Sequence, residues 1–192
     1  GMRSKHAALE GEWLPDSNLF QKINFQASQT DYKHTEFDAG TPGTLFANQG
    51  HDARVQLRHK PWRLGAGQWE GLWGLQSEQG KFSANGAEAF APFSHTRSTA
   101  AFVFEEYALN EVQFNAGARK ENVTVASLGN PDPSVDRFEV GQRKFSPQSL
   151  AASASWQWRP QWRLSTNVSK VQRAPKDYEL FANGPHLATA AW

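Results

Sequence analysis

The stretch His51-Asp52-Ala53-Arg54-Val55-Gln56-Leu57-Arg58-His59-Lys60 alternates strictly between two kinds of side chain. Alanine, valine, leucine and two histidines occupy the odd positions, and the even positions carry only charged or amide side chains. Successive residues of a β-strand point to opposite faces of a sheet. The pattern therefore predicts a strand with one apolar and one polar face.

The same two-residue period recurs on both sides of this stretch. It is clear in 112–119, 149–158 and 162–169 and weaker in 5–14, 20–31, 68–77 and 97–107. In the last of these ranges, Ala100, Phe102 and Phe104 form the expected apolar face. A helical period is almost absent. We therefore predict an all-β fold, an antiparallel up-and-down meander of about eight strands.

The connections between these strands alternate in length. Short turns are expected at Pro15 to Asn18, Pro61 to Gly67, Ala108 to Glu111 and Arg159 to Gln161. Long polar loops are expected at 32–50, 78–96 and 121–148, and a long segment, 171–192, follows the last strand. All short turns would then lie at one end of the sheet. This asymmetry is typical of outer-membrane β-barrels, whose periplasmic turns are short and whose external loops are long.

Tryptophan is the second sign of a membrane barrel. Seven of the eight tryptophans lie within a few residues of a short turn: Trp13, Trp62, Trp69, Trp73, Trp156, Trp158 and Trp162. Tryptophan favours the membrane–water interface, because its ring is apolar and its N–H needs a polar partner. Packing inside a soluble sandwich would explain the same residues, and the polar face could be solvated or line a lumen. The alternating loop lengths favour the membrane.

Composition excludes several classes of protein. The 20 basic and 19 acidic residues nearly cancel, which argues against a nucleic-acid partner. Cysteine is absent, so there is no disulfide framework and no thiolate metal site. No apolar run approaches the roughly 18 residues of a membrane helix. Neither a G-x-S-x-G nor an H-E-x-x-H motif nor a P-loop is present, so we expect no enzyme and no cofactor.

One cluster of potential metal ligands surrounds the first expected long loop. Its members, the ligand-facing loop candidates, are Asp31, His34, Glu36, Asp38, His51 and Asp52. Carboxylates and imidazoles suit Zn²⁺ or another borderline metal. An ordinary solvated loop explains the same residues and is the favoured interpretation, because a metal site needs three or four converging ligands. The metal therefore stays unassigned.

The segment near the end of the chain carries a family resemblance. Arg173-Ala174-Pro175 and Glu179-Leu180-Phe181-Ala182-Asn183-Gly184-Pro185-His186-Leu187-Ala188-Thr189 resemble the barrel of TonB-dependent outer-membrane receptors, including the zinc-uptake-like branch. Weaker similarity at 30–37, 105–107 and 116–119 extends the resemblance over nearly the whole chain. In this family the segment enters an external loop. The resemblance therefore implies a family-motif loop that contains Glu179, Asn183, Gly184, Pro185 and His186.

The resemblance implies a transporter of a scarce nutrient in the bacterial outer membrane. Its expected partners are lipid, a plug domain and the TonB protein, and the cargo would be a metal ion, a metal chelate or haem. Large barrels of this class have about 22 strands. Residues 1–192 are accordingly expected to be a single barrel segment without the plug domain, with Gly1-Met2 a tag remnant.

Two questions stay open at this stage. The segment could close into a small barrel, remain a sheet or associate with another copy through its open edge strands. The alternative function is a soluble β-sandwich or small barrel that binds carbohydrate or a small ligand. It would require Phe114 and Val168 to be buried in a protein core.

Overall fold

The computed structural model describes residues 1–38, 40–86, 89–132 and 136–183. Within them the protein is one antiparallel sheet with a single short helix, and no described helix is long and apolar enough to cross a membrane. The elements are β1 (Met2–Trp13), β2 (Phe20–Asp38), β3 (Thr41–His59), β4 (Trp62–Leu64), β5 (Gly67–Asn85), β6 (Ser94–Leu109), β7 (Val112–Ser127), β8 (Gly141–Phe145), β9 (Gln148–Arg159), β10 (Trp162–Lys170) and α1 (Asp177–Phe181).

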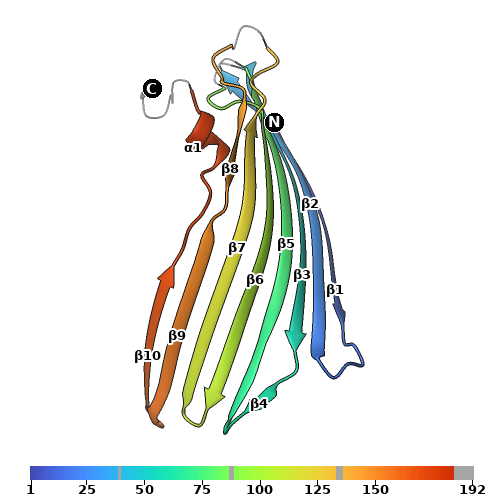
Figure 1. Ribbon diagram of the computed structural model, residues 1–192. Coiled ribbons are helices and arrows are strands. Elements are labelled where there is room, and N and C mark those ends of the chain that lie inside the picture. Colours follow the sequence, from blue (N-terminus) through green and yellow to red (C-terminus); the bar gives the residue numbers. More distant parts are fainter. Residues whose placement is uncertain (39, 87–88, 133–135, 184–192) are drawn as a thin grey trace.

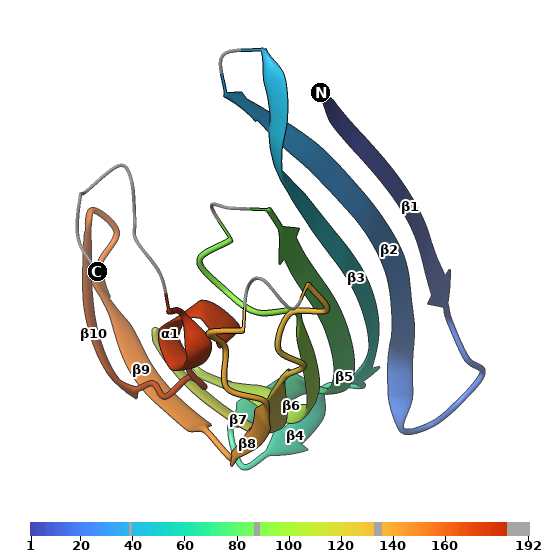
Figure 2. The same cartoon turned by 90° about the horizontal axis from the view of Figure 1, so that it is seen from above.

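The strands follow one another across the sheet in chain order. Eight long strands form the path β1-β2-β3-β5-β6-β7-β9-β10, while β4 pairs only with β5 and β8 only with β7. The long strands lie side by side (Figure 1), and from above the sheet curves around α1 (Figure 2). Among the described residues no pairing joins β1 to β10, so the sheet is open. The all-β meander predicted from the sequence is confirmed.

Several predicted connections were too long. The expected loop 32–50 is instead the far end of β2 and the beginning of β3, which pair across a narrow turn. The loops expected at 78–96 and 121–148 likewise contain the ends of β5, β6 and β7 and the strand β8. These extensions do not continue the apolar convex face, so the alternation that located the central strands does not extend into them. The turn expected at 61–67 contains β4, and the segment after β10 contains α1.

The register assigns each central side chain to a face. Val55 lies opposite Phe25 and Leu75, and the neighbouring Arg54 lies opposite Gln26 and Gln76. Directly opposed residues of an antiparallel pair point to the same face. The apolar set therefore forms one continuous surface across the sheet. It is the convex face, because α1 and the residues that contact it lie on the polar, concave side (Figure 2).

The face predicted for Ala100, Phe102 and Phe104 was wrong. Phe102 lies opposite Gly74 and Arg119, which places it on the concave, polar side, and Val103 takes the convex position opposite Trp73. The centre of β6 is apolar at five successive positions, 100–104. Alternation alone cannot assign the faces of such a strand, and the neighbouring strands decide.

Two cross-strand pairs join a glycine to a phenylalanine. Gly11 lies opposite Phe25, and Gly74 lies opposite Phe102. A Cβ atom at Gly11 would be 2.0 Å from the Phe25 ring, and one at Gly74 would be 2.1 Å from the Phe102 ring. Each ring therefore lies directly over its glycine and fills the space that a side chain would need.

The described residues form a small interior core. Val123 and Val125 of β7 and Phe181 of α1 are buried together on the concave side. The large apolar side chains of the convex face are mostly exposed, with Phe114 at 47% and Val168 at 70%. A soluble sandwich would bury these two residues, so the structure does not favour that alternative. Contiguous apolar surface of this extent marks contact with a membrane or with another protein.

Candidate functional site

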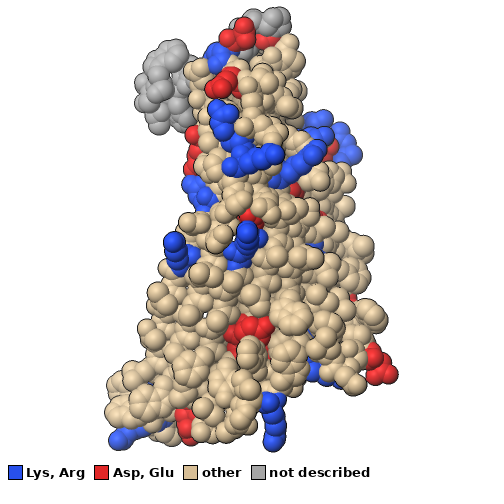
Figure 3. Space-filling view, in the orientation of Figure 1, with Lys and Arg blue, Asp and Glu red and all other residues tan. Residues whose placement is uncertain are grey.

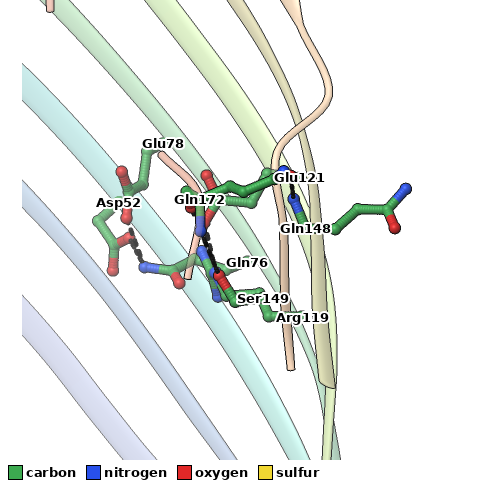
Figure 4. Close-up of polar contacts among 8 residues, drawn as sticks. All are labelled: Asp52, Gln76, Glu78, Arg119, Glu121, Gln148, Ser149 and Gln172. Carbon is green, nitrogen blue, oxygen red and sulfur yellow. Dashed lines mark hydrogen bonds and ion pairs between the residues drawn. The ribbon is translucent and has the colours of Figure 1, made fainter. Parts of the chain in front are cut away.

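The concave face carries a polar wall at mid-height, formed by Asp52, Arg54, Gln76, Glu78, Arg119 and Glu121. Gln76 donates through Nε2 to Asp52 at 2.9 Å and to Glu78 at 2.6 Å. Arg119 forms an ion pair with Glu121, and Figure 4 shows these residues of β3, β5 and β7. Among the described residues neither Asp52 nor Glu78 has a cationic partner, so this part of the wall can accept further donors.

Two arginines of the polar wall flank one aromatic ring. The guanidinium carbon of Arg54 lies 4.7 Å from the centroid of Phe102, and that of Arg119 lies 5.6 Å away. Cation–π attraction fixes both arginines on the wall. The buried Nε of Arg54 has no hydrogen-bond partner among the described residues. A buried donor in this state is costly, which favours an acceptor brought by another segment or by a ligand.

The segment that resembles the family motif folds against the concave face. Ser94 donates to Asp177, and Asn183 donates through Nδ2 to the carbonyl of Arg137 at 2.7 Å. Glu179 accepts two hydrogen bonds from Arg173, at 2.6 and 2.7 Å. Asp177 and Asn183 therefore hold the segment in place, and Glu179 joins two parts of the segment to each other. Gly184, Pro185 and His186 lie outside the described residues.

The ion pair of this segment has an electrostatic consequence. The hydrogen bonds from the Arg173 guanidinium lower the pKa of Glu179 to about 2, and the backbone N–H of Lys176 contributes. Hydrogen bonds to the charged form of a carboxyl favour ionisation. The carboxylate thus stays ionised in mild acid, and the turn before α1 keeps its shape there.

A groove of about 690 Å³ separates α1 from the polar wall. Most of its floor consists of strand residues at concave positions, and Lys176, Asp177 and Tyr178 form one rim. The lining residues at concave positions with hydroxyl, amide or carboxylate groups are Ser28, Thr30, Asn48, Asp52, Gln76, Glu78, Ser94, Thr96 and Ser98. Such a lining suits a hydrophilic ligand or a polar protein surface.

The six ligand-facing loop candidates lie on strands and not in a loop. Asp31, His34, Glu36 and Asp38 belong to β2, and His51 and Asp52 belong to β3. Asp31 and His51 take convex positions, whereas Asp52 is concave, so the set is divided between the two faces. His34 and Glu36 come together, with Nε2 3.6 Å from Oε1. No described group of three or more His, Asp or Glu residues could hold a metal.

The structure reveals an aromatic cluster that the sequence interpretation missed. His34 stacks on Phe46 with ring centroids 4.8 Å apart and lies 5.5 Å from Tyr32. Phe46 also lies 6.4 Å from both Phe82 and Phe90. Tyr32 and His34 continue the alternation of β2 beyond residue 31, which is the signal that would have predicted their shared face.

A second missed cluster lies on the convex face near the short turns. Glu105 accepts hydrogen bonds from the indole N–H groups of Trp69, at 2.5 Å, and Trp73, at 2.8 Å. Nε2 of the buried His59 lies 3.0 Å from the same carboxylate. The tryptophan side chains thus find the polar partner that residues at a membrane interface require. None of these four residues lines the groove.

Comparison with known proteins gives one family and two solved structures. Residues 4–191 match the family described as TonB dependent receptor-like, beta-barrel. The copper transporter OprC is similar with a TM-score of 0.67 and 13% identity, over 93% of this chain and 30% of that chain. The ferric citrate transporter FecA, in an unliganded form, is similar with a TM-score of 0.60 and 16% identity, over 88% and 27%.

The two solved structures support the fold, and the chain spans less than a third of the length of either. The family match covers almost every residue of the chain. An open sheet with an apolar convex face and a polar concave wall is what one part of a large barrel should be. The chain therefore belongs to the TonB-dependent receptor-like β-barrel family and forms part of the wall of an outer-membrane barrel.

Proposed function

We propose that the intact protein imports a scarce nutrient across the outer membrane, with energy supplied through TonB. The nutrient would be a metal ion, a metal chelate or haem. In this role the convex face contacts lipid, and the polar wall faces the lumen and a plug domain. The observation that carries the proposal is the division of the sheet into an apolar convex face and a charged concave one.

The groove supports a hydrophilic cargo or plug surface at this position. In the groove, Asp52 and Glu78 supply carboxylates without a cationic partner among the described residues. By their names, the two similar solved structures transport copper and ferric citrate. The zinc-uptake-like branch and the six candidates from Asp31 to Asp52 stay predictions for this chain.

Uptake by whole cells tests the transport proposal. Strains with the intact gene, without it and without TonB would be compared for accumulation of radiolabelled copper, zinc, ferric citrate and haem. We expect one cargo to accumulate only when both the receptor and TonB are present. Equal uptake of every cargo by all three strains would contradict the proposed function.

Spin labels on two neighbouring residues test the orientation of the wall. This chain has no cysteine. Once any cysteine elsewhere in the intact receptor is replaced by serine, Val55→Cys and Gln56→Cys each give one labelling site. Val55 is convex and Gln56 concave. We expect a label at residue 55 to collide more with oxygen than with a water-soluble nickel chelate, and a label at 56 to lack this preference. The reverse result would place lipid on the concave side.

Two narrower expectations belong to the same proposal. A role in the wall of a transporter requires no catalysis, and the family supports the prediction that the chain is not an enzyme. Self-association through the open edges of β1 and β10 stays a prediction, supported by the unpaired backbone groups of edge strands.

A further inference from the structure

The convex face changes character where the apolar surface ends on the side of the β2–β3, β5–β6 and β7–β8 connections, which we call the side of the long connections. Six exposed cations lie there at convex positions, and we name them the basic collar: Arg3, Lys33, Lys81, Arg97, Lys120 and Lys144. In Figure 3, which shows the convex face, Lys and Arg side chains gather above a broad area with few charges. The collar comes from β1, β2, β5, β6, β7 and β8, so it runs across most of the sheet.

The collar has almost no negative charge to balance it. In the cross-strand rows that contain these residues, Asp31 is the single carboxylate, and it lies directly opposite Lys5. Among the described residues no collar side chain forms an ion pair. Arg97 donates only to His95, at 3.3 Å. The charges of the collar are therefore available to an external anion.

The spacing within the collar favours an anion that bridges cations. Arg3 lies directly opposite Lys33, and Arg97 and Lys144 flank Thr124 in one row. Like charges placed directly opposite each other on a sheet destabilise it. A bridging phosphate removes that repulsion and gains charge-assisted hydrogen bonds.

The height of the apolar surface places the collar at the level of lipid headgroups. On β6, ten residues separate Arg97 from Tyr107, whose hydroxyl donates to the carbonyl of Leu64 near a short turn. Ten residues of a strand rise about 33 Å, which a tilt of about 40° reduces to about 25 Å of membrane thickness. Lipid tails that cover the apolar surface therefore bring their headgroups to the collar.

We propose that the basic collar binds the phosphates of anionic lipid headgroups in the leaflet nearest the long connections. This inference rests on the proposed function, because it requires the convex face to lie in a bilayer. It goes further by naming the chemistry of the lipid headgroup and the residues that bind it. Lipid bound in this way anchors the barrel at a fixed depth, since the collar and the tryptophans mark its two rims.

The test uses the intact receptor in a neutral detergent, titrated with short-chain phosphatidylglycerol or phosphatidylcholine. Native mass spectrometry counts the bound lipids. The collar variant carries Lys33→Gln, Lys81→Gln and Arg97→Gln, and the matched control carries Lys60→Gln, Arg63→Gln and Arg159→Gln, three exposed cations near the short turns. Each juxtamembrane cation contributes about fivefold to the binding of anionic lipid. We therefore expect the collar variant to lose roughly 100-fold of its affinity for phosphatidylglycerol, and the control to bind like the wild type.

Three results would overturn the inference. The first is that the wild type binds phosphatidylglycerol and phosphatidylcholine with equal affinity. The second is that the control variant loses as much affinity for phosphatidylglycerol as the collar variant. The third is that inorganic phosphate binds as tightly as phosphatidylglycerol. The spin-label contrast between residues 55 and 56, measured in the same preparations, separates this inference from the proposed function. If that contrast persists while the lipid preference is absent, the collar proposal alone fails. If the contrast is absent, the membrane orientation fails as well.

Discussion

At the scale of single residues, Glu105 joins three side chains of the convex face, and its removal should lower the stability of the barrel wall. Its carboxylate accepts from Trp69, Trp73 and His59 and has a side-chain exposure of 20%. Glu105→Ala leaves these donors without an acceptor, which costs about 1–3 kcal/mol. We expect the intact receptor to unfold at lower denaturant concentration, as monitored by tryptophan fluorescence. Among the described residues its neighbour Glu106 has no side-chain hydrogen bond or ion pair, and it faces the other side of the sheet, so Glu106→Ala is the control. Equal effects would contradict the role of Glu105.

The pair Arg173–Glu179 predicts a pH dependence of the family-motif segment. The folded-state pKa of Glu179, about 2, lies below its ordinary value of 4.5. A depressed carboxyl pKa adds stability that is complete above the ordinary value and is lost as pH falls through the folded value. We expect Arg173→Gln to return the pKa of Glu179 toward 4.5, as measured by carboxyl ¹³C NMR. An unchanged titration would show that the contacts to Arg173 do not form in solution.

The residue scale also shows where sequence interpretation stops. The alternation of 51–60 correctly separated Val55 and Leu57 from Arg54 and Arg58. It could not predict that His59 contacts Glu105, because these residues are 46 positions apart and come together only through the pairing of the strands. The sequence also grouped Asp31, His51 and Asp52 as candidates for one site, although Asp52 faces the opposite side of the sheet from the other two. Adjacent residues of a strand face opposite sides.

At the scale of elements, the packing of α1 on the sheet depends on one side chain. Phe181 is buried against Val123 and Val125, whereas Tyr178 of the same helix is largely exposed. Removing a buried phenylalanine costs about 3–5 kcal/mol. That exceeds what a five-residue helix can supply by itself. We expect Phe181→Ala to release the segment 171–183 and to speed its amide hydrogen exchange, while Tyr178→Ala does not. If the segment 171–183 exchanges at its wild-type rate in Phe181→Ala, this packing is contradicted.

Strand ends were the least predictable feature of the elements. Inside the apolar surface, the sequence located eight strands because lipid and lumen impose opposite preferences on alternate residues. Beyond residue 31 of β2 and before residue 51 of β3 the apolar side chains no longer follow the convex face, and Tyr32, His34 and Phe46 lie on the concave face. The pattern of the central strands therefore ends while the backbone pairing continues. The turn at Asn110 was predictable, and its positive φ of 51° fits the tolerance of asparagine for that conformation.

At the scale of the whole molecule, the open sheet predicts how the chain behaves alone. β1 and β10 each present an unpaired edge, and the chain spans 30% or less of the two solved structures. Unprotected edges pair with other chains. We expect the isolated 192-residue chain in detergent to form oligomers by light scattering, and the intact receptor to be monomeric. A monomeric isolated chain would show that its edges are protected in some other way.

The glycine–phenylalanine pairs of the sheet have an evolutionary consequence. Phe25 occupies the space above Gly11, and Phe102 occupies the space above Gly74, so neither glycine can gain a side chain while its ring remains. Exchange of a glycine for a larger residue is tolerated only after its partner becomes small. Among related sequences, positions 11 and 25 should therefore covary, and so should 74 and 102. Each pair would then record the strand register of this barrel in the family's substitution history.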